Sequence, residues 1–338
     1  MAMLKRPVKD RSVWYGTDFT DDDSWIETLN NKELAEIGSA LAAVETKGLG
    51  LGEFSREDFL LPTLGRRLEK IIEELEEGRG FVLLRGLPVE KYSLDQMRLI
   101  YWGIGSYFGR AVAQNNQGDI IANVKNLGVD YSKPEGRGYT SNANLRFHND
   151  GTDVVALLCW RRPKFGGTSI IASASAIYNQ VLEDKPQYLE ELYKGYRYFL
   201  RGEGASDDPN EITVAELPIF SYYKDKLSTR FNPKMILGAE QKSGVMLEPV
   251  QWEAIQYIEA LAASPEFRHS MALQPGDIQF LNNHCTYHSR EAFVDGENEN
   301  EIRHLLRLWL YLYDGRELAP GFGNRYNTGE GGGMAVKN

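Results

Sequence analysis

The sequence predicts a mainly β protein with flanking helices, built around one barrel. From about residue 120 onward, short apolar segments alternate with turns rich in glycine, proline and asparagine, which is the pattern of a β-domain. Helical segments at residues 186–194 and 249–262 interrupt these strands. Internal repeats and long linkers are absent, so we expect one domain over residues 1–338.

Both ends of the chain differ from this central region. Residues 1–60 are polar and acidic, with one helical pattern at 31–45 and a glycine-rich break at 48–52, and we expect them to form a covering N-terminal arm. The last segment, residues 321–338, contains a Gly-Glu-Gly-Gly-Gly run. We expect it to be a loose C-terminal tail.

Two helices are expected before the barrel strands. Apolar residues recur at helical spacing from Leu64 to Leu75, until glycines stop the helix and residues 81–84 begin a strand. Ser93 and Gln96 then form a capping box that opens a second helix.

The composition excludes several classes of partner. A chain with 42% hydrophobic and 25% charged residues is typical of a soluble globular protein. The formal charge of -10 argues against nucleic acid and anionic lipid, which bind basic surfaces. With no apolar run of membrane-spanning length and no signal peptide, we expect a cytoplasmic protein with a small-molecule partner. The sequence leaves open whether the chain forms a homo-oligomer.

A metal site is predicted from very few candidate ligands, because the chain has only five histidines. His148 and Asp150 are two residues apart, and on an extended backbone such residues point to the same face. One metal ion can therefore take both. A turn and strand at residues 275–280 then deliver His284 and His288, of which we choose His288 as the third ligand.

Two imidazoles and one carboxylate on one face of an octahedral ion leave three positions open. Non-haem iron(II) oxygenases use these positions for a bidentate cosubstrate and dioxygen. A His-x-Asp pair alone is weak evidence, because many such pairs are ordinary turn or surface residues.

Independent support comes from residues 303–312. Strict alternation places Arg303, Arg307, Trp309 and Tyr311 on one face of a strand and mostly leucine on the other. A buried arginine is costly unless an anion compensates its charge. The two arginines lie roughly 13 Å apart at about 3.3 Å per residue, so we expect two anionic groups, one from a cosubstrate and one from an acidic substrate.

With these features the chain resembles the taurine dioxygenase family of Fe(II)/2-oxoglutarate-dependent oxygenases, within the clavaminate-synthase-like superfamily. The resemblance covers about residues 64–312. It rests on five sequence features: Gly78-Arg79-Gly80-Phe81, His148-Asn149-Asp150, Gly166-Gly167-Thr168-Ser169, the stretch from Asn282-Asn283 to His288, and Arg303 with Arg307. The fold that it implies is a double-stranded β-helix, or jelly-roll, barrel.

The resemblance also implies roles for individual residues. His148, Asp150 and His288 would hold Fe(II), and Ser289-Arg290 after His288 matches the family pattern better than the context of His284 does. Arg303 would pair with the distal carboxylate of 2-oxoglutarate, and Arg307 would face an acidic group of the substrate. The side-chain hydroxyl that contacts 2-oxoglutarate in this family would come from Ser169 or Thr168. Asn144 matches an asparagine on the substrate side of the site.

The function that we expect from this resemblance is oxidation of an unactivated C–H bond in a small, carboxylate-bearing, amino-acid-like substrate. The reaction would consume O2 and release succinate and CO2. Hydroxylation is the usual outcome, while desaturation and cyclisation stay open. Asp153 has two readings, as a contact for a substrate amine or as a hydrogen-bond partner behind the metal ligands. The alternatives are a non-catalytic metal- or ligand-binding barrel, such as a sensor or cupin-like protein, and a zinc hydrolase.

Overall fold

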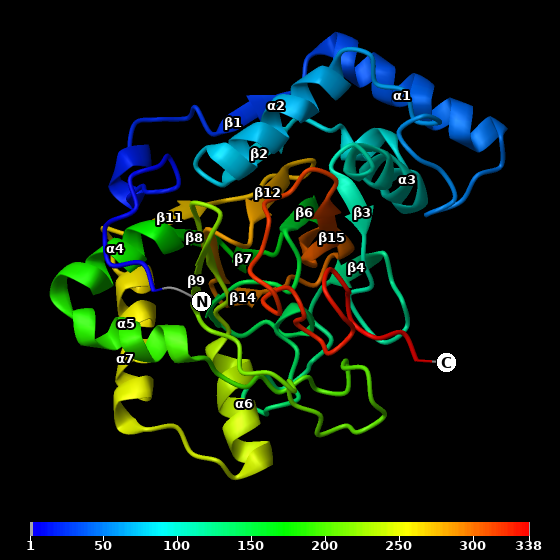
Figure 1. Ribbon diagram of the computed structural model, residues 1–338. Helices are drawn as coiled ribbons and strands as arrows, with labels where there is room; N and C mark the ends of the chain where they lie inside the picture. The colour runs from blue at the N-terminus through cyan, green and yellow to red at the C-terminus, as the bar shows by residue number, and fades with distance from the viewer. Residues whose placement is uncertain (1–2, 338) are drawn as a thin grey trace.

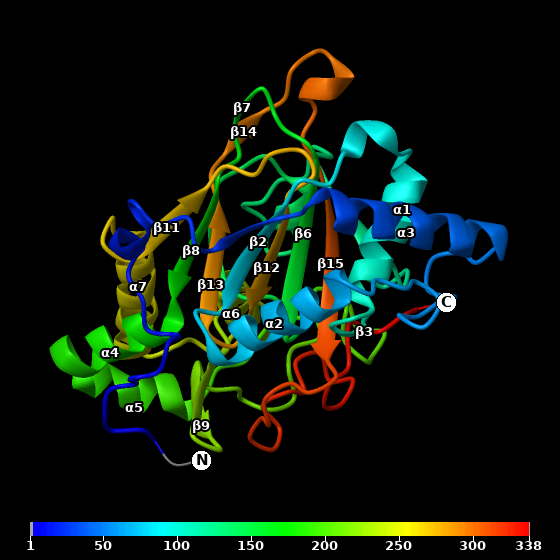
Figure 2. The ribbon, with the colours of Figure 1, turned by 90° about the horizontal axis from the view of Figure 1, so that it is seen from above.

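The computed structural model describes residues 3–337, so residues 1–2 of the expected arm and residue 338 of the expected tail lie outside it. Its centre is a seven-stranded sheet, shown in Figure 1 and Figure 2. Along the sheet the strands are β1 (Ile26–Thr28), β2 (Phe81–Arg85), β12 (Ile278–Asn282), β6 (Val154–Arg161), β15 (His304–Leu312) and β3 (Gly109–Ala111), with β4 (Ile121–Val124) also paired to β15. All pairs are antiparallel except β1 with β2.

Alternation along the strands gives this sheet two different apolar faces. On β6, Val154, Ala156 and Leu158 join a core cluster with the first three helices, whereas Val155 and Cys159 join a second cluster on the other face. The helices that cover the first face are α1 (Asn31–Thr46), α2 (Leu64–Glu77) and α3 (Leu94–Gly105), seen above the sheet in Figure 1.

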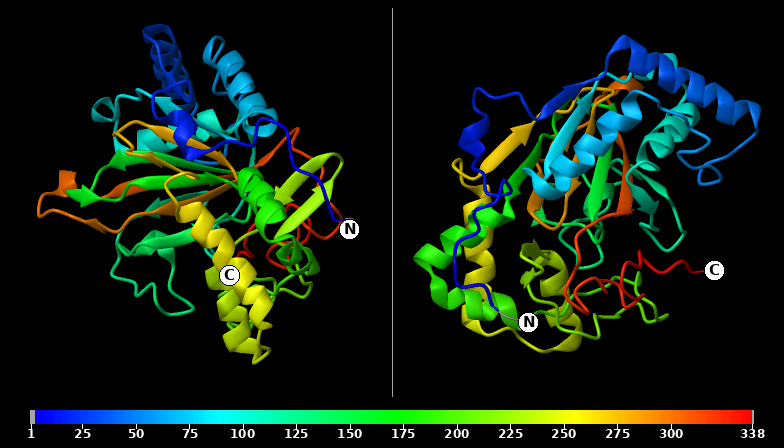
Figure 3. Two further views of the ribbon diagram at one scale, coloured as in Figure 1. Left: turned by 90° about the vertical axis from the view of Figure 1, so that its left-hand side faces the viewer. Right: turned by 45° about the horizontal axis from the view of Figure 1, so that its top comes forward.

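The second cluster is shared with a smaller, four-stranded sheet. Its strands, in order, are β11 (Arg268–Met271), β8 (Ser169–Ser173), β13 (Thr286–Arg290) and β5 (Leu145–His148). Helices α4 (Ala174–Asp184) and α7 (Pro249–Ala263) pack beside this sheet, as Figure 3 shows, and α5 (Pro186–Lys194) packs against both of these helices. Two sheets with helices outside them agree with the expected sheets and flanking helices, but in the described part of the chain the α-helices contain more residues than the strands, so the fold is a mixture of sheets and helices rather than mainly β.

The remaining elements are short. They are two ribbons, β9 (Phe220–Tyr223) with β10 (Lys226–Thr229) and β7 (Phe165–Gly166) with β14 (Phe293–Val294), the helix α6 (Pro233–Ser243), and single turns of 3-10 helix at Gly16–Phe19, Val89–Lys91, Gly138–Thr140 and Glu299–Glu301. Within residues 3–337, no helix combines the length and apolar character needed to cross a bilayer.

The expected helices form where the sequence places them, within a residue or two. The capping box at the start of α3 is present, since the Ser93 hydroxyl accepts from the backbone N–H of Gln96 and the Gln96 amide oxygen accepts from that of Ser93. Two helices, α4 and α6, were not predicted from the sequence. In α4 the residues run on from strand β8 without a break, because Ser173 ends the strand and caps the helix at once.

The C-terminal segment differs from the expectation of a loose tail. After β15 it folds back and lies beside the end of that strand in both Figure 1 and Figure 2. Phe322, Arg325, Tyr326 and Met334 are buried, with Arg325 only 1% exposed. The glycines permit tight turns, while these four larger side chains provide the packing that composition alone did not reveal.

Candidate active site

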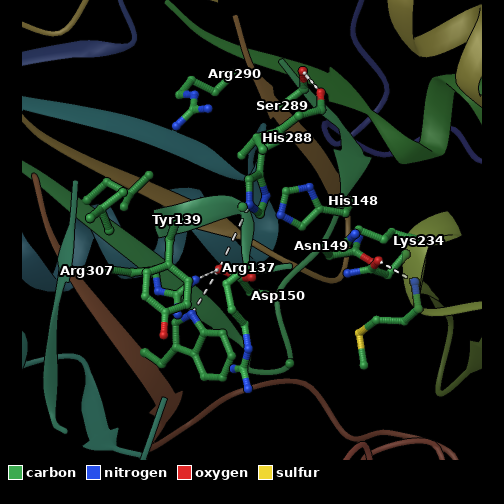
Figure 4. A pocket seen from close by; sticks show the side chains of 18 of the residues that line it. Arg137, Tyr139, His148, Asn149, Asp150, Lys234, His288, Ser289, Arg290 and Arg307 are labelled. Carbon is green, nitrogen blue, oxygen red and sulfur yellow. Dashed lines mark hydrogen bonds and ion pairs between the residues drawn. The ribbon is translucent and has the colours of Figure 1, made fainter. Parts of the chain in front are cut away.

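The two histidines of the predicted metal site come from neighbouring strands of the smaller sheet. His148 ends β5, and it pairs directly with His288 in the middle of β13. Their ring centroids lie 4.3 Å apart, and Figure 4 shows the two rings side by side. Ligand atoms of His148, Asp150 and His288 all lie within 4.8 Å of one another. Residues that are 140 positions apart in the sequence, His148 and His288, thus meet through strand pairing.

Asp150 follows β5 in a turn that two asparagines hold in place. The backbone N–H and side chain of Asn149 both bond to the backbone of Phe231, at 2.8 and 2.5 Å. The backbone N–H of Asp150 donates to the side-chain oxygen of Asn283 at 3.0 Å. These bonds explain why asparagine lies between the two ligands and why another precedes His284.

The carboxylate of Asp150 is held by two donors from β15. The indole N–H of Trp309 donates to Oδ2 at 2.9 Å, and Arg307 Nη1 lies 3.5 Å from the same oxygen. Burial acts to raise the pKa of Asp150, but the charge of Arg307, the nearby imidazoles and the Trp309 bond together lower it. The residue is therefore a carboxylate, ready to accept a cation.

Both imidazoles are neutral because burial lowers their pKa values, to about 3 for His288. His148 Nδ1 lies 2.8 Å from the carbonyl oxygen of Arg146, so that nitrogen carries the proton and donates to it. This leaves the Nε2 lone pair of His148 free toward Asp150 and His288. Neutral nitrogen donors with one carboxylate fit a divalent transition metal such as iron.

Arg303 and Arg307 both line the cavity that contains the three ligands, but in different surroundings. The Arg303 guanidinium stacks 5.1 Å from the Phe293 ring, and the space beside Gly167 is occupied by its Nε and Cδ atoms. The Arg307 guanidinium lies between the rings of Tyr139 and Trp309, and its Nε donates to Gln114. Among the described residues, Arg303 Nη1 and Arg307 Nη2 are buried without a hydrogen-bond partner, as expected of groups that await anions.

The structure separates the two candidate hydroxyls. Ser169 lines the main cavity together with His288 and both arginines, whereas Thr168 lines a small neighbouring hollow on the other side of Arg303. Asn144 is exposed and lies outside the lining residues, so the cavity as folded gives it no contact with a substrate.

Asp153 and His284 also lie outside the cavity lining, directly behind the site. Asp153 Oδ1 accepts from His284 Nε2 at 2.8 Å, and its other oxygen accepts from the backbone N–H of Leu312. His284 Nδ1 then lies 3.3 Å from Arg325 Nη2, and Arg325 Nη1 donates to the backbone carbonyl of Asp150 at 2.7 Å. This chain of contacts holds the turn that carries Asp150 in place. It favours the interpretation of Asp153 as a hydrogen-bond partner behind the predicted metal ligands over that of a contact for a substrate amine.

Residues 45–309 match the model of the family described as "Taurine catabolism dioxygenase TauD, TfdA family". The chain belongs to this family. It is therefore a 2-oxoglutarate-dependent non-haem iron dioxygenase that uses Fe(II), 2-oxoglutarate and O2, and neither the non-catalytic barrel nor the zinc hydrolase is supported.

Two curated relatives cover almost the whole TauD/TfdA-family chain. The "FR-33289 synthase" of Streptomyces rubellomurinus (strain ATCC 31215) is 34% identical over 321 residues, 94% of each chain. The "Taurine hydroxylase-like protein SAT17" of Stachybotrys chartarum (strain CBS 109288 / IBT 7711) is 30% identical over 316 residues, 90% of this chain and 80% of the relative.

Solved structures share the fold at low sequence identity. An asparagine oxygenase in complex with Fe(II), 2S,3S-3-hydroxyasparagine and succinate superposes with a TM-score of 0.67 at 17% identity, covering 85% of this chain and 93% of that one. The non-haem iron oxygenase OrfP, in complex with Fe, succinate and (3S)-hydroxy-L-Arg, superposes with a TM-score of 0.59 at 13% identity. The match covers 87% of this chain and 99% of that one.

Several cavity residues of this dioxygenase were not expected from the sequence. Apart from Lys234, which lies in the first turn of α6, they fall in irregular connections and in the C-terminal segment, where no periodic pattern marks a face; they are Tyr131, Arg137, Arg201, Arg230, Asn232, Lys234, Arg325, Tyr326 and Met334. The one available signal was that Arg137 and Arg201 stand beside glycines in connecting segments, where binding residues are frequent.

Proposed function

We propose that the protein oxidises an unactivated C–H bond of a small, acidic, amino-acid-like substrate, most simply by hydroxylation, with succinate and CO2 as coproducts. The proposal assigns the metal to His148, Asp150 and His288, and the whole fold to the double-stranded β-helix, or jelly-roll, type. The single observation that carries it is the ligand triad, with His288 buried and His148 and Asp150 partly buried, which opens into a cavity lined by Arg303 and Arg307.

Each side chain has a distinct task in this proposal. Bound Fe(II) with 2-oxoglutarate supplies the activation of dioxygen that no side chain provides. Arg303 is placed to hold the distal carboxylate of 2-oxoglutarate, since its free Nη1 atom is buried and Ser169 lies nearby in the cavity wall. Arg307 is placed to hold the substrate's acidic group, with Tyr139 and Trp309 on either side of its guanidinium.

The substrate class has support from two directions. The solved relatives with the same fold carry hydroxylated asparagine or arginine in their complexes, so this architecture accepts amino acids. The cavity of this chain adds aromatic side chains around cationic ones, which suits a small substrate with an acidic end.

The test is an anaerobic optical titration of the purified protein with Fe(II) and 2-oxoglutarate, and it requires no substrate. We expect a weak visible charge-transfer band in the wild type. The band should require a higher 2-oxoglutarate concentration in Arg303→Ala, and should be unchanged in Arg268→Ala, an exposed arginine on β11. A well-folded, iron-loaded protein without the band would contradict the assignment of the site.

A further inference from the structure

The cavity wall carries far more positive than negative side chains. Eight of its lining residues are arginine or lysine, and Asp150 is the one carboxylate among the described lining residues. Arg303 and Arg307 have roles in the proposed function, and Arg290 donates to the backbone carbonyls of Ser141 and Ala143. Buried cations are costly without anions, so the remaining charges indicate a further anionic ligand.

Of the other five cations, Lys234 donates to the backbone carbonyls of Tyr131 and Lys133, and Arg325 donates to that of Asp150. Three arginines then remain, on the part of the wall formed by loops. We call Arg137, Arg201 and Arg230 the cationic cluster. Arg137 and Arg201 both form ion pairs with Glu203, with Arg201 Nη2 at 3.6 Å, and the Glu203 side chain is fully buried. Because two guanidiniums share one carboxylate, this pair of arginines keeps one positive charge in excess.

Arg230 adds a second uncompensated charge. Its Nη2 atom donates to the backbone carbonyl of Arg325 at 2.9 Å, and its guanidinium lies 4.2 Å from the centre of the Tyr198 ring. No carboxylate of the described residues forms an ion pair with it, and its Nη1 atom is buried without a partner, the side chain being only 5% exposed. Burial lowers the pKa of Arg230 to about 10, so the group remains charged at neutral pH.

The members of the cluster line the same cavity as one tyrosine of the C-terminal segment, Tyr326. The Tyr326 ring in turn packs over Gly151, directly after the metal ligand Asp150. The cluster therefore faces the same space as the metal site.

The backbone at Arg201 supports a binding role. Its φ of 55° lies in the left-handed region, which residues other than glycine and asparagine seldom adopt. Strain of this kind is concentrated at functional sites. Arg201 Nε is also buried without a hydrogen-bond partner in the described part of the chain.

We propose that the cationic cluster binds a doubly charged oxoanion of the phosphate-monoester type, carried by the substrate in addition to the acid group that faces Arg307. This inference rests on the proposed function and narrows its substrate class. Two uncompensated positive charges match a dianion, and three acceptor oxygens suit several guanidinium groups at once. A carboxylate or a sulfate ester would compensate only one of the two charges.

The experiment compares methyl phosphate with methyl sulfate, which share a tetrahedral shape but differ in charge. Binding is measured by calorimetry on the anaerobic protein loaded with Fe(II) and 2-oxoglutarate, so that Arg303 is already occupied. At pH 7.5 we expect methyl phosphate to bind about tenfold more tightly than methyl sulfate. At pH 5 the preference should shrink, because a phosphate monoester with a second pKa near 6 is then a monoanion.

Variants locate the binding. Arg230→Gln and Arg201→Gln should each weaken methyl phosphate binding about tenfold or more, and Arg66→Gln, an exposed arginine on α2, should leave it unchanged. If Arg201→Gln does not fold, Arg230→Gln and the comparison of the two pH values still decide. Equal affinity for both probes, or full affinity in Arg230→Gln, would overturn the proposal.

The result is separable from the test of the proposed function. The same titration is repeated on metal-free protein with 2-oxoglutarate present. An iron-dependent visible band without preference for methyl phosphate would leave the oxygenase assignment standing and remove the subsite. Preference for methyl phosphate in a protein that gives no band would support the subsite and remove the assigned metal chemistry.

Discussion

Arg307 Nη1 lies 3.5 Å from Oδ2 of Asp150, so the guanidinium that is proposed to bind the substrate contacts the carboxylate that is proposed to bind the metal. Trp309, two residues further along β15, donates to the same carboxylate oxygen. A single strand therefore connects the substrate end of the cavity with the metal end. We propose that an anion bound to Arg307 would draw the guanidinium toward itself and leave more of the Asp150 charge for the metal that this carboxylate is proposed to hold.

Replacing Arg307 tests this connection. In Arg307→Gln we expect the visible band of the Fe(II) and 2-oxoglutarate complex to persist, while the KM for the substrate rises roughly 10- to 100-fold, since a charge-assisted hydrogen bond is lost. Steady-state succinate formation gives the KM and the anaerobic optical titration gives the band, with Arg66→Gln as the matched control. Loss of the band itself would place Arg307 on the cosubstrate.

Replacing the carboxylate ligand has a different consequence. Asp150→Ala should abolish turnover, because two imidazoles then hold the metal and the Trp309 indole loses its acceptor. Substrate-dependent succinate formation and bound iron are measured on the same samples. Full activity in Asp150→Ala would remove this residue from the ligand set.

The two hydroxyls beside the paired glycines are also distinguishable. Ser169→Ala should raise the 2-oxoglutarate concentration for half-saturation of the visible band several-fold, because Ser169 lines the main cavity. Thr168→Val should change it little, because Thr168 faces the neighbouring hollow. The opposite order of effects would assign the hydroxyl role to Thr168.

The sequence predicted the parts of the site that lie on regular strands. The polar face of residues 303–312 was visible because a strand alternates with a period of two, and the leucines on the opposite face do pack against the helices. The pair of His148 and Asp150 was visible for the same reason, as two residues near the end of one strand.

What the sequence did not reveal depends on irregular backbone. Arg201 and Arg230 reach the cavity through loops whose course is fixed by distant contacts, such as the bond from Arg230 to the carbonyl of Arg325. The segment from 321 onward was expected to be loose because glycine favours the unfolded chain. Buried Tyr326 and Arg325 outweigh that preference, and such tertiary contacts have no local signal.

Arg325 is not one of the proposed metal ligands, but it donates to the backbone carbonyl of Asp150. We therefore predict that replacing Arg325 changes the metal affinity indirectly. Arg325→Gln should weaken Fe(II) binding about 10- to 100-fold, as changes behind metal ligands typically do. His284→Leu should have an effect in the same direction, and the double variant should be less than additive, because both residues act through one chain of contacts. Anaerobic iron titrations measure all three. Additive effects would show that Arg325 and His284 act independently.

His269 predicts how stability depends on pH, away from the active site. It is buried among Phe19, Trp25 and Phe81, and this burial lowers its pKa to about 4. The unfolded chain takes up the proton near pH 6.5 and the folded chain only near pH 4, so stability falls as the pH drops through this window. Each pH unit lost in the window costs about 1.4 kcal/mol through this one group. In His269→Phe the free energy of unfolding should therefore fall about 2 kcal/mol less between pH 7.5 and pH 5 than in the wild type. Denaturant unfolding at the two pH values measures the difference, and an identical loss in both proteins would show that His269 is protonated in the folded state.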